Sequence, residues 1–253
     1  MITIKTKEEI EIISQNGKIV AETLDLLCKS AKPGVSTLEL NDIADTFIRD
    51  HGAVPSCFGY KGYPKSICVS INEEIVHGMP SERKLEEGQI VTFDVCLNKN
   101  GFHADAATTI PIGNVSEKAL QLINVCNESF YEGIKKANVG NRITDITFAI
   151  YSYVKSRGFS VIKNYGGHGI GRELHESPFV PNYYCKCKEL GTYIQEGMVF
   201  TVEPMICVGK RQIKVLDNKW TVVTVDSSLA AHCEHTVAII DGKAKILTNL
   251  EDV

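Results

Sequence analysis

The chain has 253 residues, of which 43% are hydrophobic and 23% charged, and its formal net charge is −4. This composition is ordinary for a globular protein, and a domain of this length buries roughly three-quarters of the surface of its unfolded chain. Lys and Arg are scattered without a long run, which argues against tight nucleic-acid binding through a basic domain. A local basic contact, for instance with a ribosome, is compatible with this charge.

The sequence shows no pattern of export or membrane insertion. Its first residues, MITIKTKEEIEIIS, lack the continuous apolar segment of a signal peptide. No stretch approaches the roughly 18 apolar residues that a membrane-spanning helix needs. The nine cysteines are an odd number spread through apolar segments, a pattern typical of reduced, buried thiols. We therefore expect a cytoplasmic protein.

Four helices are expected. Thr6 and Ser36 are each followed three residues later by Glu, the capping-box pattern of a helix start. Apolar residues after these starts recur with helical spacing, and Lys32-Pro-Gly34 stops the first helix. The predicted helices run from Thr6 to before Lys32, from Ser36 to His51, over residues 116–138 and over residues 144–158.

Segments typical of β-strands lie between and after the helices, at residues 66–71, 89–97, 102–112, 197–206, 219–225 and 235–241. The two halves of the chain resemble each other weakly, because TFDVC is followed by HADAATT and FTVEP by HCEHTVA. In each half, helices precede a strand with one acid and a strand with His-x-acid. This repeat predicts an α+β architecture of two related halves around one shared sheet, and no linker divides the chain.

Two predicted strands carry a carboxylate in an apolar setting. Asp94 lies within IVTFDVCL and Glu203 within MVFTVEPMI. Burying an ionised carboxylate without compensation is very costly, so such groups are normally paired or bound to metal. Asp105 and Glu234 occupy matching places on the strands that follow. One such acid is more simply explained by a strand face that meets water, but four in matching places indicate a shared site.

The turn at residues 98–101 decides how close Asp94 and Asp105 come. A pivot between Lys99 and Asn100 would set the two aspartates directly opposite each other, with Cβ atoms about 5 Å apart. A tight Asn100-Gly101 turn would shift the register by two and make them diagonal neighbours. In both cases they share a face, and like charges this close repel unless a cation lies between them or one is protonated.

A glycine-rich stretch at residues 164–176, NYGGHGIGRELHE, contains two histidines. Its glycines argue against a helix and let a ligand approach the backbone closely. His168 or His175 can add one neutral imidazole to the four carboxylates. Two divalent cations would neutralise this set, and paired metal ions are a common means of activating water. The other histidine would then be free to contact substrate.

These motifs resemble those of type I methionine aminopeptidases, a family of pita-bread metallopeptidases. The resemblance extends over nearly the whole chain, from KPGVSTLEL at residue 32 to CEHTVAI at residues 233–239. It rests on five segments in order: FDVC, HADAATT, GGHGIGRELHE, FTVEPM and CEHT. It implies a pita-bread fold with pseudo-twofold halves and a central antiparallel sheet flanked by helices. It also implies one catalytic domain, residues 1–253, without the N-terminal zinc-binding extension of some relatives.

The resemblance implies a role for each clustered residue. Asp94 would chelate one metal ion, His168 and Glu203 would serve the other, and Asp105 and Glu234 would bridge the pair. The ions would be Co, Mn, Fe or Zn, because an oxygen-rich set with one imidazole accepts each of them. Glu203 would also carry a proton from the attacking water to the leaving amine.

Substrate contacts follow from the same resemblance. His77 and His175 would hydrogen-bond the substrate and steady the tetrahedral intermediate. Thiol and aromatic contacts suit a flexible thioether side chain. The side-chain pocket is implied to include Cys57, Tyr60, Tyr63, Cys68 and Trp220.

The chain departs from the family pattern at three places. Leu174 stands where an aromatic residue is usual, Lys61 where His is common, and His232-Cys233 where Gln and an aromatic residue are more usual. These changes are expected to touch pocket walls rather than metal ligands. His103 and His232 occupy matching positions of the repeat, and both are interpreted as strand residues.

The implied activity is removal of the initiator methionine from nascent proteins whose second residue is small. A second interpretation is an exopeptidase of the same fold that acts at Xaa-Pro bonds, although such relatives normally carry a large extra N-terminal domain. A third is a catalytically inactive module that binds peptides, which would have lost metal ligands. The expected partners are the N-termini of nascent polypeptides, with no membrane and no specific nucleic acid, and the expected state is a monomer.

Overall fold

The computed structural model describes residues 2–184 and 191–250. Both capping boxes expected from the sequence are present, since the hydroxyls of Thr6 and Ser36 accept hydrogen bonds from the backbone N–H groups of Glu9 and Glu39. The four predicted helices are confirmed, and the third ends earlier than expected. The helices are α1 (Lys7–Ser30), α2 (Thr37–Asp50), α3 (Glu117–Ile134), α4 (Ile143–Ser156) and the short 3-10 helix η1 (Tyr60–Gly62).

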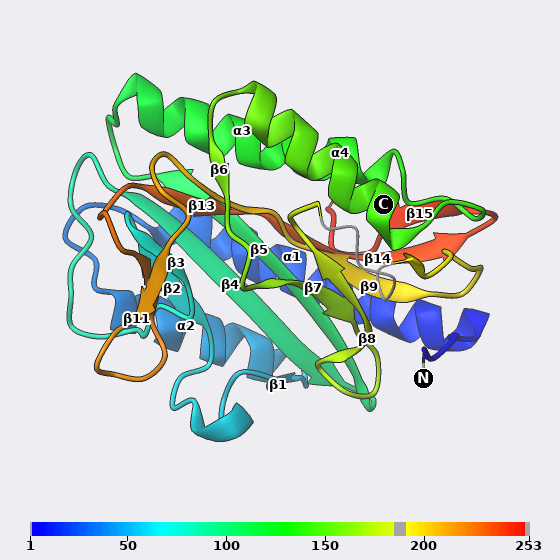
Figure 1. Ribbon diagram of the computed structural model, residues 1–253. Coiled ribbons are helices and arrows are strands. Elements are labelled where there is room, and N and C mark those ends of the chain that lie inside the picture. The colour runs from blue at the N-terminus through cyan, green and yellow to red at the C-terminus, as the bar shows by residue number, and fades with distance from the viewer. Residues whose placement is uncertain (1, 185–190, 251–253) are drawn as a thin grey trace.

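A nine-stranded antiparallel sheet forms the centre of the molecule (Figure 1). Its main path has the order β1-β4-β5-β14-β9-β7-β8, while β2 pairs with β4 and β15 with β14 outside this path. The strands are β1 (Val54–Pro55), β2 (Cys68–Ile71), β4 (Ile90–Lys99), β5 (Phe102–Pro111), β7 (Gly166–Gly169), β8 (Glu176–Pro181), β9 (Val199–Val202), β14 (Glu234–Ile240) and β15 (Lys243–Ile246).

Two three-stranded antiparallel sheets accompany the central one. The first has the order β13-β10-β6 and the second β11-β12-β3. The second sheet brings the segments around His77 and Trp220 together, because β3 precedes His77 and β12 follows Trp220. The strands are β3 (Glu74–Val76), β6 (Ser160–Val161), β10 (Met205–Cys207), β11 (Ile213–Val215), β12 (Val222–Thr224) and β13 (Ala230–His232).

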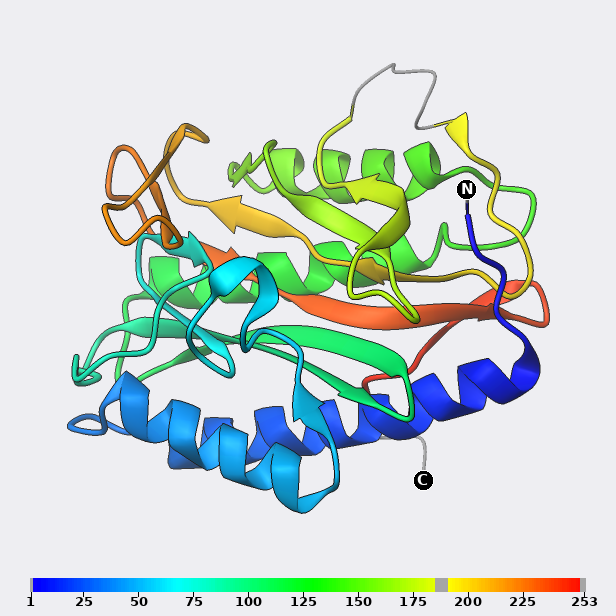
Figure 2. The ribbon, with the colours of Figure 1, turned by 90° about the horizontal axis from the view of Figure 1, so that it is seen from below.

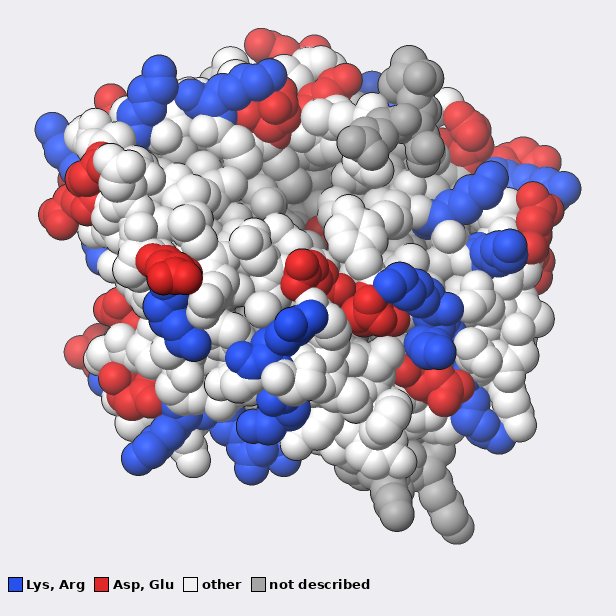
Figure 3. All heavy atoms as spheres, turned by 90° about the horizontal axis from the view of Figure 1, so that it is seen from above, with Lys and Arg blue, Asp and Glu red and all other residues white. Residues whose placement is uncertain are grey.

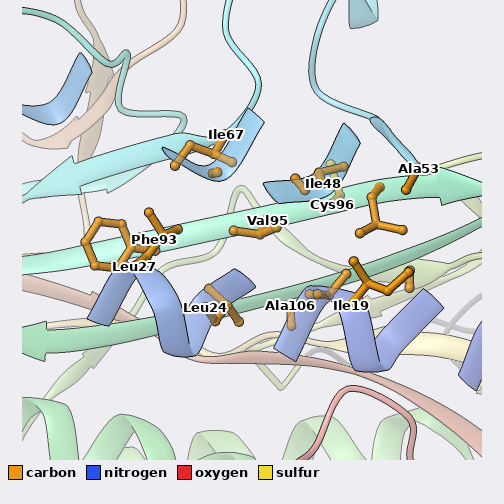
Figure 4. Close-up of a cluster of buried hydrophobic side chains, with 14 of the residues drawn as sticks. Ile19, Leu24, Leu27, Ile48, Ala53, Ile67, Phe93, Val95, Cys96 and Ala106 are labelled. Atoms are coloured by element: carbon orange, nitrogen blue, oxygen red, sulfur yellow. The ribbon is translucent and has the colours of Figure 1, made fainter. Parts of the chain in front are cut away.

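The two helix pairs cover the central sheet in matching ways. Helix α1 packs against β4 and β5, and α2 packs against α1, β1 and β2, in a hydrophobic cluster that includes Leu24, Phe93 and Val95 (Figure 4). Helices α3 and α4 pack on the other half, in a second cluster that includes Phe130 and Phe200. In Figure 2 the blue pair lies along the bottom of the view, and the green pair lies above it, one helix behind the strands and one near the top. The expected α+β fold, with two related halves flanked by helices, is confirmed.

The long strands β4 and β5 have two different faces. Phe93 and Val95 belong to the cluster beneath α1. Since successive side chains of a strand point to opposite faces, Asp94 lies on the face away from α1. Asp105 lies on that face too, because it pairs with Cys96, two residues from Asp94. The helices therefore cover one face of these strands, and the acids occupy the other.

The tighter of the two anticipated turns joins β4 to β5. Lys99 pairs with Phe102, and Asn100 and Gly101 both have positive φ, 55° and 77°. Positive φ at both central residues is the property of a type I′ turn, which Asn-Gly favours. Asp94 and Asp105 are therefore diagonal neighbours rather than a directly opposite pair.

One predicted strand is interrupted. Residues 197–206 form two strands, β9 and β10, which separate at Glu203 and Pro204. Proline has no N–H to donate to a ladder, so the chain leaves the central sheet there and β10 joins the sheet of β13 and β6. The prediction of one continuous strand was wrong, and Glu203 follows the end of β9 instead of lying within a strand.

No helix among the described residues is long and apolar enough to cross a membrane. On the face drawn in Figure 3, Lys and Arg are interspersed with Asp and Glu, and the described residues there form no extended area of one sign. A surface of this kind creates no single-sign field that would attract a charged partner over a long distance.

Candidate metal centre and substrate pocket

Three carboxylates converge on one face of the central sheet. Ala107 of β5 pairs with Asp94 of β4 on one side and with Glu234 of β14 on the other. Asp105 lies two residues from Ala107 on the same strand and so points to the same face. The strand alternation predicted from sequence, together with the observed register, thus brings three acids from three neighbouring strands together.

Glu203 completes the set from the end of β9. The register of β9 and β14, continued one residue past Val202, sets Glu203 opposite Glu234. Thr201 Oγ1 donates a hydrogen bond to Glu203 Oε1 at 2.8 Å, and Asn182 Nδ2 donates to the Glu203 carbonyl at 2.7 Å. These two contacts fix both the carboxylate and the backbone where the strand ends.

His168 comes from β7, where glycines allow a close approach of neighbouring strands. A Cβ atom on Gly167 would lie 2.2 Å from the Thr201 carbonyl oxygen, so a larger residue does not fit. The Nδ1 of His168 lies 3.0 Å from the Gly169 carbonyl oxygen. A hydrogen bond there places the proton on Nδ1 and leaves the Nε2 lone pair for a metal. Nε2 lies 3.7 Å from Glu203 Oε1.

Burial changes the proton affinity of all five groups. It raises the pKa of Asp94 to about 7 and the pKa of Glu203 to about 8. It also raises the pKa of Asp105 and of Glu234 well above the usual value, and the negative charges of neighbouring acids add to this effect. The pKa of His168 falls to about 4, again because of burial. The imidazole is therefore neutral, and the carboxylates need a cation in order to be ionised together.

Two buried oxygens of this cluster, Asp105 Oδ1 and Glu234 Oε1, have no hydrogen-bond partner. Buried acceptors are normally satisfied, so this pair calls for a ligand. Ligand atoms of Asp105, His168 and Glu234 all lie within 4.8 Å of one another, and so do those of Glu203, His232 and Glu234. Carboxylates and imidazole together suit Mn, Fe, Co and Zn ions. The site therefore fits a divalent metal.

Two further histidines border the cluster. The His175 ring centroid lies 4.1 Å from that of His168, and the ring stacks on Tyr60 at 5.3 Å. His77 has a positive φ of 58° and meets the Tyr165 ring edge to face at 5.7 Å. Burial lowers the pKa of His77, and it lowers the pKa of His175 to about 3. Both rings are therefore neutral hydrogen-bonding groups at neutral pH.

A cavity of about 650 Å³ contains this cluster and the predicted side-chain pocket. The volume is within the usual range for small-molecule sites. Tyr63 and Trp220 meet edge to face with centroids 5.1 Å apart, and the Tyr63 hydroxyl reaches the carbonyl oxygens of Ile67 and Gly78. The cavity is lined by every residue that the sequence assigned to the site: Cys57, Tyr60, Tyr63, Cys68, His77, Asp94, Asp105, His168, His175, Glu203, Trp220 and Glu234.

Of the departures from the family pattern, Lys61, Leu174 and His232 line the same cavity, whereas Cys233 is buried in the hydrophobic cluster of α3 and α4, contrary to expectation. Lys61 and Leu174 form part of its wall, as expected. His232 differs from this expectation, because its Nε2 lies 3.6 Å from Glu234 Oε2, within the second group of possible ligands. No local pattern indicates this contact, because His232 ends β13 and Glu234 begins β14, and these strands belong to different sheets. Asp94 borders the cavity but lies outside both groups of possible ligands.

Known proteins similar to this chain agree in family and fold. Metallopeptidase family M24 matches residues 11–241. A methionine aminopeptidase of Clostridium acetobutylicum is 52% identical over 252 residues, which cover 99% of this chain and 100% of that protein. The crystal structure of methionine aminopeptidase from Thermotoga maritima has 39% sequence identity and a TM-score of 0.95, covering 98% of this chain and 100% of the other. A prolidase from Pyrococcus furiosus is 24% identical, with a TM-score of 0.80. The match covers 98% of this chain and 66% of the prolidase chain, and it shows a shared fold alone.

A curled antiparallel sheet that carries a buried cluster of carboxylates and imidazole in a cavity defines the class as a metal-dependent hydrolase of the pita-bread fold. The chain belongs to metallopeptidase family M24, and the relatives that it matches over their full length carry the name methionine aminopeptidase. The family resemblance found in the sequence motifs is thereby confirmed.

Proposed function

We propose that this chain removes the N-terminal methionine from polypeptides whose second residue is small. One observation carries the proposal: a single cavity combines a cluster that fits metal with a wall of thiols and aromatic rings. The full-length relatives named methionine aminopeptidase support the same activity. The substrates would be the N-termini of nascent polypeptides, and the protein would act in the cytoplasm as a monomer with one catalytic domain. Contact with a ribosome stays an expectation of the same kind.

The four carboxylates and His168 would hold two divalent ions. We assign Asp94 to one ion, His168 and Glu203 to the other, and Asp105 and Glu234 to both. Two ions carry as many positive charges as the four acids carry negative ones, so all four can be ionised together. When bound, such a pair lowers the pKa of water and stabilises negative charge on the substrate carbonyl oxygen. Co, Mn, Fe and Zn all suit this donor set.

Glu203 is the group that we assign to proton transfer. The hydrogen bond from Thr201 Oγ1 holds its carboxylate in place. A carboxylate held in this way can accept a proton from water and release it to a leaving group. Glu203 would take a proton from the attacking water and deliver it to the leaving amine.

His77 and His175 would bind the peptide group of the substrate. Each is a neutral imidazole, which can donate one hydrogen bond. A donor aimed at the carbonyl oxygen is worth most as negative charge develops there during attack. The stacking of His175 on Tyr60 restricts the orientation of the ring, so that little reorganisation is needed when substrate binds.

The remaining wall of the cavity would select the methionine side chain. Cys57, Tyr63, Cys68 and Trp220 present sulfur atoms and aromatic rings beside the carboxylates. Polarizable sulfur and aromatic edges make favourable contacts with a thioether. Because Tyr63 is fixed by two hydrogen bonds and by Trp220, this wall is preformed.

Peptide hydrolysis tests the proposal. Metal-free protein is supplied in turn with Mn, Fe, Co or Zn and given the peptides Met-Ala-Ser and Met-Lys-Ser. We expect methionine release from the first peptide only, with at least one of the metals. Failure of every metal to release methionine would refute the proposal. Preferential cleavage of an Ala-Pro substrate in parallel would favour the Xaa-Pro exopeptidase, and binding of less than one equivalent of metal would favour the inactive peptide-binding module.

A further inference from the structure

His232 occupies a fixed position beside the carboxylates. It is the last residue of β13 and Glu234 begins β14, and the two side chains lie close together, with His232 Nε2 3.6 Å from Glu234 Oε2. Its backbone N–H donates to Thr109 Oγ1 at 2.9 Å, and the Thr109 hydroxyl contacts its carbonyl oxygen at 2.7 Å. The backbone also pairs with Met205 of β10. The backbone of His232 is thus held from both sides, and the residue is only 2% exposed.

Neither ring nitrogen of His232 has a hydrogen-bond partner. A buried imidazole normally has partners at both nitrogens, because burial of an unpaired polar group costs free energy. The distance of 3.6 Å from Nε2 to Glu234 Oε2 is too long for a good hydrogen bond. Two ligand atoms that each lie about 2.1 Å from one ion in tetrahedral geometry are about 3.4 Å apart. His168 Nε2 and Glu203 Oε1, at 3.7 Å, show the same kind of spacing.

We propose that His232 Nε2 is a further imidazole ligand of the metal centre, to an ion that Glu203 and Glu234 also hold. The three residues form a buried group whose ligand atoms lie within 4.8 Å of one another. This inference rests on the metal centre of the proposed function. It changes the donor set from four carboxylates with one imidazole to four carboxylates with two.

A second imidazole has a predictable effect on metal preference. Imidazole nitrogen favours Zn, Co and Fe over Mn and Mg, which prefer oxygen ligands. His232 therefore raises the affinity for Zn²⁺ more than the affinity for Mn²⁺. A competing arrangement, in which a protonated His232 pairs with Glu234 as an ion pair, would have no such effect on metal preference.

The test counts imidazole ligands and compares metal affinities. Metal-free protein is loaded with two equivalents of Mn²⁺ and studied by pulsed EPR, which detects the nitrogen atoms bound to the ion. Zn²⁺ and Mn²⁺ affinities are measured by competition with a chromophoric chelator. We expect two coupled imidazoles in the wild type and one in His232→Gln. We also expect His232→Gln to lose at least about tenfold in Zn²⁺ affinity and less in Mn²⁺ affinity.

His103→Gln is the matched control. His103 stands at the repeat position that corresponds to His232, but its Nδ1 bonds Ser56 Oγ at 2.7 Å and it is absent from the residues that line the cavity. We expect this variant to match the wild type in both measurements. An equal loss of affinity in the control would show that any His-to-Gln change on these strands disturbs the site, which would overturn the assignment to His232.

The outcomes separate this inference from the proposed function. A single imidazole in the wild type that His168→Gln removes would overturn the role of His232 and leave the metal centre standing. A wild type that binds no metal would refute the proposed function itself. The wild-type imidazole count decides the question even if His232→Gln fails to fold, and His232→Asn then provides the second variant for the affinity comparison.

Discussion

Replacing Asp94 with Asn should stabilise the metal-free protein, although the change removes a proposed metal ligand. Asp94 lies in an apolar strand with Asp105 as its diagonal neighbour, and Glu234 lies beyond Ala107. Burial raises the pKa of Asp94 from 3.8 to about 7. Asparagine has nearly the same shape and carries no charge, so the substitution relieves the cost of ionising this position.

The size and the pH dependence of the effect follow from this pKa. A rise of about three pH units corresponds to about 4 kcal/mol. Water in the cavity reduces this cost, so we expect a gain of about 2 kcal/mol, or about 4–8 °C in melting temperature. Because the pKa of this acid is raised in the folded state, its contribution to stability is complete below about pH 4 and is lost as the pH rises to about pH 7. The advantage of Asp94→Asn should therefore widen from about pH 5 to about pH 8.

Thermal unfolding after removal of metal by a chelator measures this effect. Asp217→Asn, which changes an exposed carboxylate, is the control and should melt with the wild type. Excess Mn²⁺ should reverse the order, because the wild type gains binding free energy through a ligand that the variant lacks. A metal-free Asp94→Asn protein that melts below the wild type at both pH values would refute the argument that the cluster is destabilised by its own charge.

Three further substitutions test the assigned roles. Asp105→Asn should reduce bound metal from two equivalents to about one or fewer by elemental analysis, since a bridging ligand serves both ions; retention of both would contradict the bridging role. His175→Ala should lower kcat by about 10²–10⁴-fold at unchanged metal content. Loss of metal in this variant would instead mean that His175 is the metal ligand and His168 the substrate contact. Trp220→Ala should reduce the preference for Met-Ala-Ser over Leu-Ala-Ser by about tenfold or more in kcat/KM. An equal loss of kcat/KM on both peptides would mean that Trp220 only supports Tyr63 and does not select the substrate side chain.

The parts of the fold that depend on local chemistry could be predicted from the sequence. Thr6 and Ser36 satisfy the first N–H groups of α1 and α2 through neighbours three residues away, so the pattern and the structure have the same cause. The position of Asp94 in an apolar strand is also visible locally, because the free-energy cost of an ionised carboxylate follows from its burial. A resemblance that extends over nearly the whole chain added the family and its fold, which no single motif defines.

The parts that depend on contacts between distant segments could not be settled in the same way. Both turns considered for residues 98–101 were compatible with the sequence, and the structure has the type I′ turn. The end of β9 at Pro204 was missed because the mainly apolar run 197–206 has the composition of one strand, and the partner that takes over, β13, lies far along the chain. His232 was missed for a related reason, since its distance to Glu203 depends on where β10 and β13 meet.

The reverse face of the strands that carry the carboxylates contributes stability that offsets the cost of the cluster. Asp94 and Asp105 face the cavity, while Phe93 and Val95 on β4 are fully buried against α1. Burying each of these apolar side chains contributes about 1.5–3 kcal/mol, so the two together match the cost of about 4 kcal/mol that ionising Asp94 alone would bring. Ala107, which pairs with the strands on both sides of it, adds no bulk between the acids. Alternation along β4 and β5 therefore lets one strand pair carry a core on one face and the acids of the proposed metal centre on the other.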